Sequence, residues 1–502
     1  NKHPEFLLGY QDIPEQQAQL PLTVDFNDCG HILVVGSPGY GKSTFIQNAL
    51  IDVMRKTTPE QSHIYLYDFG TSGLISLVDF PHVADYFTAD DNEKVMKSLR
   101  RLQKEVKVRK AALSEARSSN MQQYNRDAVT PFPSLFIAID SFDGVSDATF
   151  SEAFNETVNI LAREGASLGI YLITTMSRFN AMRVQLQANF KTKIALYLFE
   201  QSDVTSIVGR TSQVLLDIRG RGLMKQDTVV SFQVCVPYTS EDNSSMIQQV
   251  KAEAQEMSRY WTGELPQPIP MLPEVVTPEM VEAQVDRSER NHQVLLGLTR
   301  EMVEVAAFTL DKAISLVSDN VRSVTQFYKV LAYQLQQYTN LVQVVIVDPL
   351  GLVPLDQFKE AHRFSDTLSA KDGMNIILDN LKERMTQPGE YTQSLIIIPD
   401  IQILGQSLNI TENQFKELLL EGPKYGITPV FIGNYKDLMT NYSTLVTLHR
   451  QLATQVFMGM RISDQEYVRF PYISNEKSPR PNEGYIVDAE GYEFVQLMSI
   501  EE

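Results

Sequence analysis

The chain has 502 residues, of which 43% are hydrophobic and 21% are charged. This composition is typical of a globular protein, and the length predicts two or more domains, because a single hydrophobic core rarely serves so many residues. No apolar run approaches the roughly 20 residues that a membrane-spanning helix needs. The formal net charge of −18 disfavours a protein that tracks along nucleic acid, which needs a basic surface.

The acidic charge is concentrated in the second half of the chain. Residues 1–262 carry 25 Lys and Arg against 30 Asp and Glu, whereas the remaining residues carry 19 against 32. Only two cysteines are present, Cys29 and Cys235, which favours a reducing cytosol over a disulfide-stabilised secreted protein. We therefore expect a cytosolic setting and no nucleic-acid partner.

In the first half, apolar runs alternate with helical patterns. The runs lack the apolar–polar alternation of a half-exposed strand, so they predict buried parallel strands. Strands are expected in Glu5–Tyr10, at the start of His31–Phe45, and in His63–Gly70, Ser134–Asp140 and Leu168–Thr175. Helices are expected over Ser43–Lys56, Asn92–Ser118 and Phe150–Glu164. Strands that alternate with helices predict a wound α/β sheet.

The segment Gly36–Thr44 reads GSPGYGKST and matches the phosphate-binding pattern G-x-x-x-x-G-K-[ST], between an apolar run and a helix. Glycines let backbone N–H groups curl around a polyanion, and the following helix directs its positive dipole end to the same place. We expect Lys42 to contact the β- and γ-phosphates of ATP as a catalytic residue, and Ser43 to bind Mg²⁺. The nucleotide-binding residues predicted by the motif are Gly36, Ser37, Pro38, Gly39, Tyr40, Gly41, Lys42, Ser43 and Thr44.

Asp140 ends the apolar run that starts at Ser134, and a carboxylate in this Walker B position can hold Mg²⁺ through water and serve catalysis. An aspartate at a strand end can also be only a helix cap. The next residue is Ser141, where many hydrolytic motors place a glutamate that polarises the attacking water. Because the loss of a positioned base costs roughly 10²–10⁴ in rate, we expect tight ATP binding with slow hydrolysis. Asp143 would need a different backbone path to reach that water.

A basic stretch, Lys94–Lys110, has the apolar spacing of a helix. An amphipathic helix with a solvated basic face is the simpler interpretation. Contact with nucleic acid or with a neighbouring subunit is the alternative.

A proline-rich segment, Gly263–Pro278, separates two similar halves, and its prolines exclude a continuous helix or central strand. We place one domain at residues 1–262, a linker at residues 263–289 and a second domain at residues 290–502. The second half repeats the strand segments of the first in the same order. These are Gln293–Leu298, Ala313–Phe327, Val342–Gly351, Ser394–Asp400 and Tyr425–Gly433, with helices over Val321–Tyr338 and Ile376–Met385.

The second half has lost the phosphate-binding loop. When the repeats are aligned, the three glycines and the lysine are replaced by Ser318, Val321, Ser323 and Val324. Asp319 would also bring negative charge close to the phosphates. Asp400 keeps the Walker B position, but it lies between Pro399 and Ile401. We therefore expect no ATP hydrolysis in this domain, which would serve as a binding platform, a regulator or a packing partner.

With both repeats in view, the sequence resembles FtsK/SpoIIIE-type motor ATPases, and within them the C-terminal ATPase tandem of the EssC/EccC family of bacterial type VII secretion. Leu186–Arg210 and Gly220–Val234 resemble the family's later blocks, and Leu448–Gln465 and Pro479–Leu497 are weaker counterparts. The degenerate second domain is what points to the secretion branch. The resemblance implies an α/β fold with two tandem RecA-like P-loop ATPase domains, each a mainly parallel sheet flanked by helices.

The resemblance also implies a cellular setting. It suggests the cytoplasmic portion of a bacterial inner-membrane protein that forms a homo-hexamer, works with other subunits of the secretion machinery and recognises WXG100-type secreted proteins. In related proteins the last ATPase domain binds the substrate's C-terminal signal segment, which assigns that task to residues 290–502. Two other functions stay open: a DNA translocase of the same fold, against which the net charge weighs, and a non-catalytic adaptor gated by ATP.

Overall fold

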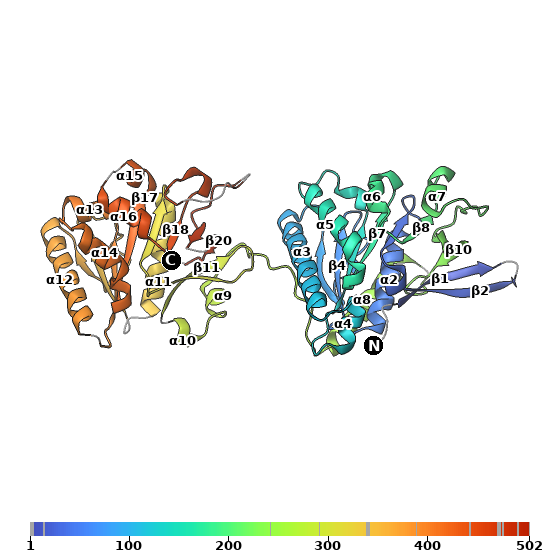
Figure 1. Ribbon diagram of the computed structural model, residues 1–502, viewed down its shortest axis with the longest axis horizontal. Helices are drawn as coiled ribbons and strands as arrows, with labels where there is room; N and C mark the ends of the chain where they lie inside the picture. Colours follow the sequence, from blue (N-terminus) through green and yellow to red (C-terminus); the bar gives the residue numbers. More distant parts are fainter. Residues whose placement is uncertain are drawn as a thin grey trace. The chain divides into compact units, whose positions relative to one another are not determined.

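The computed structural model describes residues 5–13, 16–240, 242–290, 292–337, 342–387, 389–440, 443–468, 473, 476–488 and 491–500. The chain divides into two compact units, residues 1–269 and 270–502. Each unit has its own ten-stranded sheet with helices on both faces (Figure 1). The division falls within the proline-rich segment, and the short helices α9 (Pro278–Glu282) and α10 (Arg287–Arg290) come at its end and after it.

The sheet of the first unit has the order β2-β1-β10-β9-β8-β3-β7-β6-β4-β5. The six strands from β8 to β5 are parallel, and β9, β10, β1 and β2 extend the sheet with antiparallel pairs. The strands are β1 (Glu5–Ile13), β2 (Ala18–Asp25), β3 (Ile32–Val35), β4 (Ser62–Asp68), β5 (Val83–Phe87), β6 (Ser134–Asp140), β7 (Ile170–Met176), β8 (Thr192–Leu196), β9 (Arg221–Lys225) and β10 (Val229–Val234).

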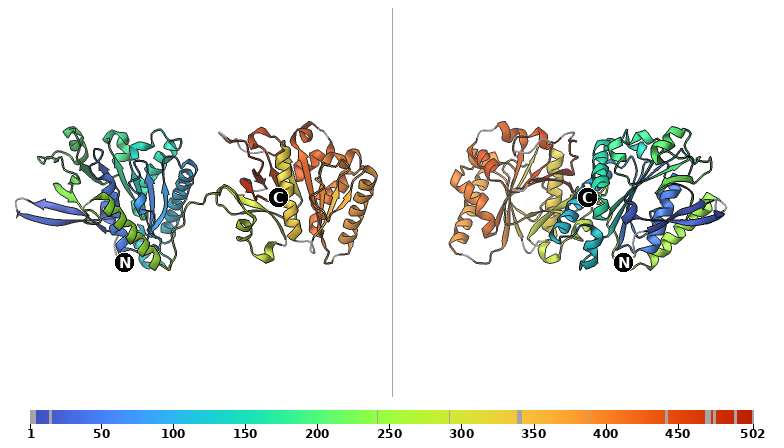
Figure 2. Two further views of the ribbon diagram at one scale, coloured as in Figure 1. Left: turned by 180° about the vertical axis from the view of Figure 1, so that it is seen from behind. Right: turned by 45° about the vertical axis from the view of Figure 1, so that its right-hand side comes forward.

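Helices bury a separate hydrophobic core on each face of this sheet. On one face, α2 (Lys42–Lys56) and α8 (Asn243–Tyr260) cover the sheet and share a core (Figure 2, left). An ion pair between Arg55 and Glu253 joins the two helices. On the other face, α3 (Asn92–Glu115) and α5 (Ser151–Glu164) form the second core. The shorter helices are α1 (Phe26–Cys29), α4 (Met121–Asp127), α6 (Val184–Gln187) and α7 (Gln201–Val208).

The second unit repeats this plan strand for strand, in the order β12-β11-β20-β19-β18-β13-β17-β16-β14-β15. Its strands are β11 (Gln293–Thr299), β12 (Val305–Thr309), β13 (Ile314–Ser318), β14 (Val342–Val347), β15 (His362–Phe364), β16 (Gln393–Ile398), β17 (Ile427–Asn434), β18 (Val456–Met458), β19 (Glu483–Val487) and β20 (Tyr492–Leu497). Helices α9 and α11 (Val321–Gln337) cover one face. The other face carries α12 (Thr367–Thr386), α13 (Ile401–Gln406), α14 (Glu412–Leu420), α15 (Tyr435–Thr440) and α16 (Thr444–Leu452).

The predicted tandem of mainly parallel α/β sheets is confirmed. Each pair of matching segments found in the sequence occupies corresponding strands, such as β4 with β14 and β6 with β16. The helix expected over Ile376–Met385 begins earlier, at Thr367, because the Asp366 side chain caps its first turn in a capping box. The helix expected over Val321–Tyr338 is α11, and Tyr338 lies outside the described residues.

Candidate nucleotide-binding site

The loop between β3 and α2 carries three glycines that serve two purposes. Gly39 and Gly41 have φ angles of +86° and +99°, in the left-handed region that residues with a side chain rarely adopt. At Gly36, a Cβ would lie 2.8 Å from the Cβ of Leu196 on the neighbouring strand β8. Gly39 and Gly41 therefore allow the tight curl of the loop, and Gly36 allows the close approach of the loop to the sheet.

Lys42, the first residue of α2, is folded back into this loop. Its Nζ donates hydrogen bonds to the carbonyl oxygens of Gly36 and Ser37, at 2.8 and 3.1 Å. Burial lowers the pKa of Lys42, and the carboxylates of Asp140 and Asp143 oppose that shift. A buried ammonium group at a helix N-terminus is suited to bind an anionic oxygen.

Ser43 and Asp140, the two predicted magnesium ligands, lie together. Ser43 Oγ donates to Asp140 Oδ2 at 2.6 Å, and Thr175 Oγ1, near the end of β7, donates to Oδ1 at 2.5 Å. Asp140 is almost completely buried, which raises its pKa. A hydroxyl and a carboxylate beside a phosphate-binding loop are hard oxygen donors of the kind that Mg²⁺ prefers, so these residues fit the ion. From the sequence, Thr175 is only a strand residue, although its hydroxyl ends an apolar run.

A loop that the sequence does not single out covers the Ser43–Asp140 pair. It follows β4 and includes Gly73, where a Cβ would lie 2.8 Å from Ser43 Oγ and 3.2 Å from Asp140 Oδ2. Gln47, on α2, donates a side-chain hydrogen bond to Gly73 O. Asp68, the last residue of β4, accepts a hydrogen bond from a backbone N–H of the loop at 2.9 Å. These two hydrogen bonds hold the loop against the site at Gly73 and Leu74.

A second wall supports the phosphate-binding loop from the other side. Backbone hydrogen bonds run from Ser37 N to Tyr197 O at 2.8 Å and from Gly220 N to Tyr40 O at 3.1 Å. The Tyr40 hydroxyl donates to Asp217 at 2.6 Å, and its ring packs on that of Tyr197 with centroids 4.6 Å apart. The segment around Gly220, whose sequence resembles the closing block of the family, thus holds the loop in place.

A cavity of about 380 Å³ opens next to this loop, below β10 and the start of α8. Gly41 and Thr44 form its loop side, and Arg219, Gln233 and Asp242 bring polar groups to it. Small-molecule sites are commonly concave and of similar volume, roughly 300–1,000 Å³, with a few placed polar groups. Only Gly41 and Thr44 of this lining belong to the motif that the sequence reveals.

The corresponding place in the second unit is built differently. The helix α11 begins at Val321, directly after Asn320, so residues aligned with the glycine loop are already helical. Asn320 Oδ1 accepts a hydrogen bond from Arg322 N at 2.9 Å, which caps the helix. Ser318, the last residue of β13, donates from Oγ to Gly459 O at 2.8 Å. This hydrogen bond joins the end of β13 to the residue that follows β18.

Asp400 has a different role from Asp140. It is the N-cap of α13, and its Oδ1 accepts a hydrogen bond from Gln402 N at 2.9 Å. The carboxylate that the first unit directs to Ser43 is therefore used in the second unit to start a helix. The preceding strand end is shared: Asp348, like Asp68, accepts loop N–H groups, from Leu352 and Val353, at 2.8 Å each.

Comparisons with known proteins agree with this geometry. Residues 9–227 match the FtsK/SpoIIIE family. The chain is 32% identical over 497 residues to the type VII secretion system protein EssC of Staphylococcus aureus (strain NCTC 8325 / PS 47), covering 99% of this chain and 34% of EssC. Its structure superposes on EssC (ATPases 2 and 3) from Geobacillus thermodenitrificans with a TM-score of 0.87 and 25% identity, covering 99% of this chain and 96% of that one. The chain is homologous to EssC over nearly all of its length, and its first unit matches the FtsK/SpoIIIE family.

The tandem also shares its fold with Thermomonospora curvata EccC (ATPases 2 and 3), solved in complex with a signal sequence peptide. That match has a TM-score of 0.61 and 17% identity, and it covers 100% of this chain and 94% of that one.

The predicted family is confirmed, and a P-loop ATPase fold implies nucleotide binding. The chain spans about a third of the length of the curated EssC relatives, 34%. Across the described part of the chain, no helix has the length and apolar character to cross a membrane.

The basic stretch of the tandem is largely used by contacts within the first unit. It lies on α3, where Arg109 is fully buried and donates to the backbone oxygens of Leu168 and Pro133 at 2.8 Å each. Lys97 is 4% exposed, and Lys110 forms an ion pair with Glu164 at 2.8 Å. These contacts favour the amphipathic-helix interpretation over a nucleic-acid surface.

Proposed function

We propose that this tandem is the ATP-binding part of a type VII secretion motor, and that its first unit binds ATP with Mg²⁺. The observation that carries this proposal is the Ser43–Asp140 hydrogen bond of 2.6 Å beside Lys42. Lys42 would exchange the loop carbonyls for phosphate oxygens, and Ser43 and Asp140 would hold the metal ion. The bound ion would neutralise phosphate charge. The cavity beside Thr44 is the proposed place of the nucleoside.

Hydrolysis at this site is proposed to be slow. Ser141 follows Asp140 where many motors have a glutamate, and a serine hydroxyl is a poor base at neutral pH. The chain would act mainly as a switch that binds ATP. Single-turnover hydrolysis at several per second would contradict this view.

Thermal denaturation with and without Mg-ATP tests the site. Binding at 100 times Kd should stabilise the chain by about 2.7 kcal/mol and raise Tm. Lys42→Ala should lose the shift, whereas Lys107→Ala, which removes an exposed lysine of α3, should keep it. A shift retained by Lys42→Ala would contradict the proposal. A shift without any turnover would favour the ATP-gated adaptor over the motor.

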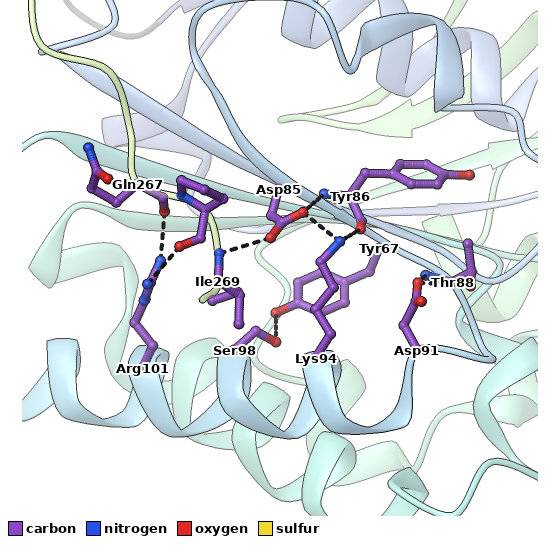
Figure 3. A network of polar contacts seen from close by, with 11 residues as sticks. Tyr67, Asp85, Tyr86, Thr88, Asp91, Lys94, Ser98, Arg101, Gln267 and Ile269 are labelled. Atoms are coloured by element: carbon purple, nitrogen blue, oxygen red, sulfur yellow. Dashed lines mark hydrogen bonds and ion pairs between the residues drawn. The ribbon is translucent and has the colours of Figure 1, made fainter. Parts of the chain in front are cut away.

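We further propose that the second unit engages the secreted substrate, and the first unit indicates how. There the extended segment Gln267–Ile269 docks between β5 and α3 (Figure 3). Arg101 donates to the carbonyl oxygens of its first two residues at 2.7 and 2.9 Å. Asp85, paired with Lys94 at 2.7 Å, accepts from Ile269 N at 2.9 Å. The Ile269 side chain is 4% exposed and anchors the segment in the core.

The corresponding groove of the second unit lies between β15 and α12. The two helices correspond, because Arg109 of α3 and Arg384 of α12 both donate to backbone oxygens just before the start of corresponding strands, β7 and β17. Asp85 then corresponds to His362, because the two residues pair with equivalent positions of the neighbouring parallel strands. These strands are β4 for Asp85 and β14 for His362. Arg101 corresponds to Ile376, ten residues after the helix N-cap in both units.

This second groove has a volume of about 260 Å³ and lacks the ionic residues of its counterpart, because His362 and Ile376 take the places of Asp85 and Arg101. Its helix side is formed by Gly373, Ile376 and Ile377, and its sheet side includes Phe364 and Ile396. Ile376 is 60% exposed, so its apolar side chain is accessible at this groove. Because the first groove takes an extended segment with one apolar anchor, the second suits a segment of the same kind from another protein.

The proposed occupant is the C-terminal signal segment of a WXG100-type secreted protein. The EccC structure in complex with a signal sequence peptide supports a peptide site in such a tandem. Homo-hexamer formation, contact with other secretion subunits and a place on the cytoplasmic side of the bacterial inner membrane are part of the same proposal, drawn from the family.

Fluorescence anisotropy with a labelled WXG100 C-terminal peptide tests the groove. Ile376→Asp should weaken binding by at least tenfold, because a carboxylate placed against the apolar anchor must be desolvated. Leu420→Asp changes an exposed leucine on α14 and should leave the affinity unchanged. Equal binding by wild type and Ile376→Asp would place the peptide elsewhere, and binding to a WXG100 protein that lacks its C-terminal tail would remove the assignment.

A further inference from the structure

The chain takes an unusual path directly after Asp140. Ser141 has φ +63° and ψ +59°, in the left-handed region, and a short 3₁₀ turn from Phe142 to Val145 follows. For a residue with a side chain, this conformation costs roughly 1–2 kcal/mol. Such strain is retained where the surrounding structure fixes it, frequently at functional sites. Here the buried side chains of Phe142 and Val145 fix the turn.

The turn brings Asp143 back to the edge of the sheet that carries the nucleotide site. Ser177 N donates to the two carboxylate oxygens of Asp143 at 3.3 and 3.4 Å. Ser177 directly follows β7, which lies in the sheet between β3, the strand before the phosphate-binding loop, and β6, the strand that ends at Asp140. The Asp143 carboxylate is also near enough to Lys42 to favour the charged form of the Lys42 side chain.

In the second unit this arrangement is absent from the described residues. The chain enters α13 directly after Asp400, so the residue aligned with Asp143 is Ile403, which is buried. Asn434, aligned with Ser177, uses its side chain to accept a hydrogen bond from Lys436 N at 3.0 Å. Among the described residues, the strained turn and the Asp143 carboxylate therefore occur only in the unit that has the glycine loop.

We propose that Asp143 is the general base for the slow hydrolysis of the first unit, because Ser141 provides no base at the usual position. This inference rests on the proposed ATP site. A water oxygen attacks the γ-phosphorus, and its proton passes to the Asp143 carboxylate. The bond from the γ-phosphorus to the β–γ bridging oxygen breaks, and its electron pair leaves with ADP. Inorganic phosphate is the second product, and Asp143 later returns the proton to solvent.

The alternative is that Asp143 only ties the turn to β7. Asparagine separates the two roles, because its Oδ1 can still accept the Ser177 N–H but cannot take a proton. Alanine removes both the charge and the tie. Asp147, four residues further along and exposed, offers Asp147→Asn as a matched control.

The test combines three measurements on the whole chain: single-turnover hydrolysis of γ-labelled ATP, affinity for a fluorescent ATP analogue, and Tm. Asp143→Asn should reduce the hydrolysis rate on the order of 10²-fold, with affinity and Tm close to those of wild type. Asp143→Ala should lose the rate and also lower Tm, and Asp147→Asn should change none of the three.

Two outcomes would overturn the assignment while ATP binding stands. One is an unchanged rate in Asp143→Asn with a lower Tm in Asp143→Ala, which leaves only the structural tie. The other is a wild type that binds ATP and shows no hydrolysis above background. Failure of the wild type to bind the ATP analogue would instead refute the proposed nucleotide site, and the base with it.

Discussion

The sheets of the two units have the same strand order, yet the backbone takes different paths after the central strands, β3 and β13. In the first unit, Gly39 and Gly41 take positive φ angles, and the chain makes a loop before α2 starts at Lys42. In the second, the aligned residues are Val321 and Ser323, which favour the right-handed helical region, and α11 has already begun. The same number of residues thus forms a phosphate-binding loop in one unit and a helical turn in the other.

The carboxylate after the Walker B strand shows the same contrast. Asp140 faces hydroxyl groups of Ser43 and Thr175, whereas Asp400 caps a helix. What both units keep is the scaffold: the strand-end aspartates Asp68 and Asp348 fix the loop after β4 and β14 alike. The fold therefore depends on the shared cores and strand ends, whereas the chemistry depends on a few residues with special backbone angles.

Gly73→Ala should give the largest effect on this contrast, because a Cβ would lie 2.8 Å from Ser43 Oγ. The Ser43–Asp140 pair would be pushed apart, and Mg²⁺-dependent ATP affinity should fall roughly 10- to 100-fold, as for other residues that support metal ligands. Titration with a fluorescent ATP analogue, with Mg²⁺ and with EDTA, measures this.

Gly351→Ala is the matched control in the second unit, because a Cβ there meets nothing within 4 Å and only its φ of +68° opposes the change. That variant should keep the ATP affinity of wild type. If Gly73→Ala binds Mg-ATP as tightly as wild type, the loop after β4 has no role in holding the metal site.

Much of this comparison could be predicted from the sequence. The glycine loop, Lys42, Ser43 and Asp140 follow a motif with fixed spacing, and the paired apolar runs identify equivalent strands. The contributions of Thr175 and Gly73 could not be predicted, because they come from strands and loops far away along the chain and have no local signature. The path that returns Asp143 to the site depends on one backbone conformation, at Ser141, which no residue pattern specifies.

Acid should destabilise the second unit through His449, which is completely buried. His449 bonds Ser315 Oγ on β13 at 2.8 Å, at the place where β3 has the buried Leu33. Burial lowers the pKa of His449 from 6.5 to about 3. Below pH 6.5 the unfolded chain takes up a proton that the folded unit does not, so stability falls as the pH decreases toward 3. Between pH 7 and pH 5 the loss is about 2 kcal/mol, a factor of roughly 30 in the folding equilibrium.

Hydrogen exchange of the β13 amides at pH 7 and pH 5, corrected for the intrinsic exchange rates, measures this loss within the second unit. His449→Gln should remove most of the pH-dependent part, although it lowers stability at both pH values. His292→Gln, at an exposed histidine, should retain the wild-type dependence. An unchanged pH dependence in His449→Gln would show that another group carries the proton uptake.

The smallest effect concerns the helix that replaced the glycine loop. Asn320 caps α11 through its side chain, whereas Gly41, the N-cap of α2, has no side chain to do so. Asn320→Ala should destabilise the second unit by about 1 kcal/mol, and Asn320→Gly by only a few tenths, because glycine adopts the N-cap backbone more easily. Hydrogen exchange in the first turns of α11 distinguishes the two variants. Equal protection in Asn320→Ala and wild type would mean that core packing alone starts this helix, and that the loss of the phosphate-binding loop needed no cap to replace it.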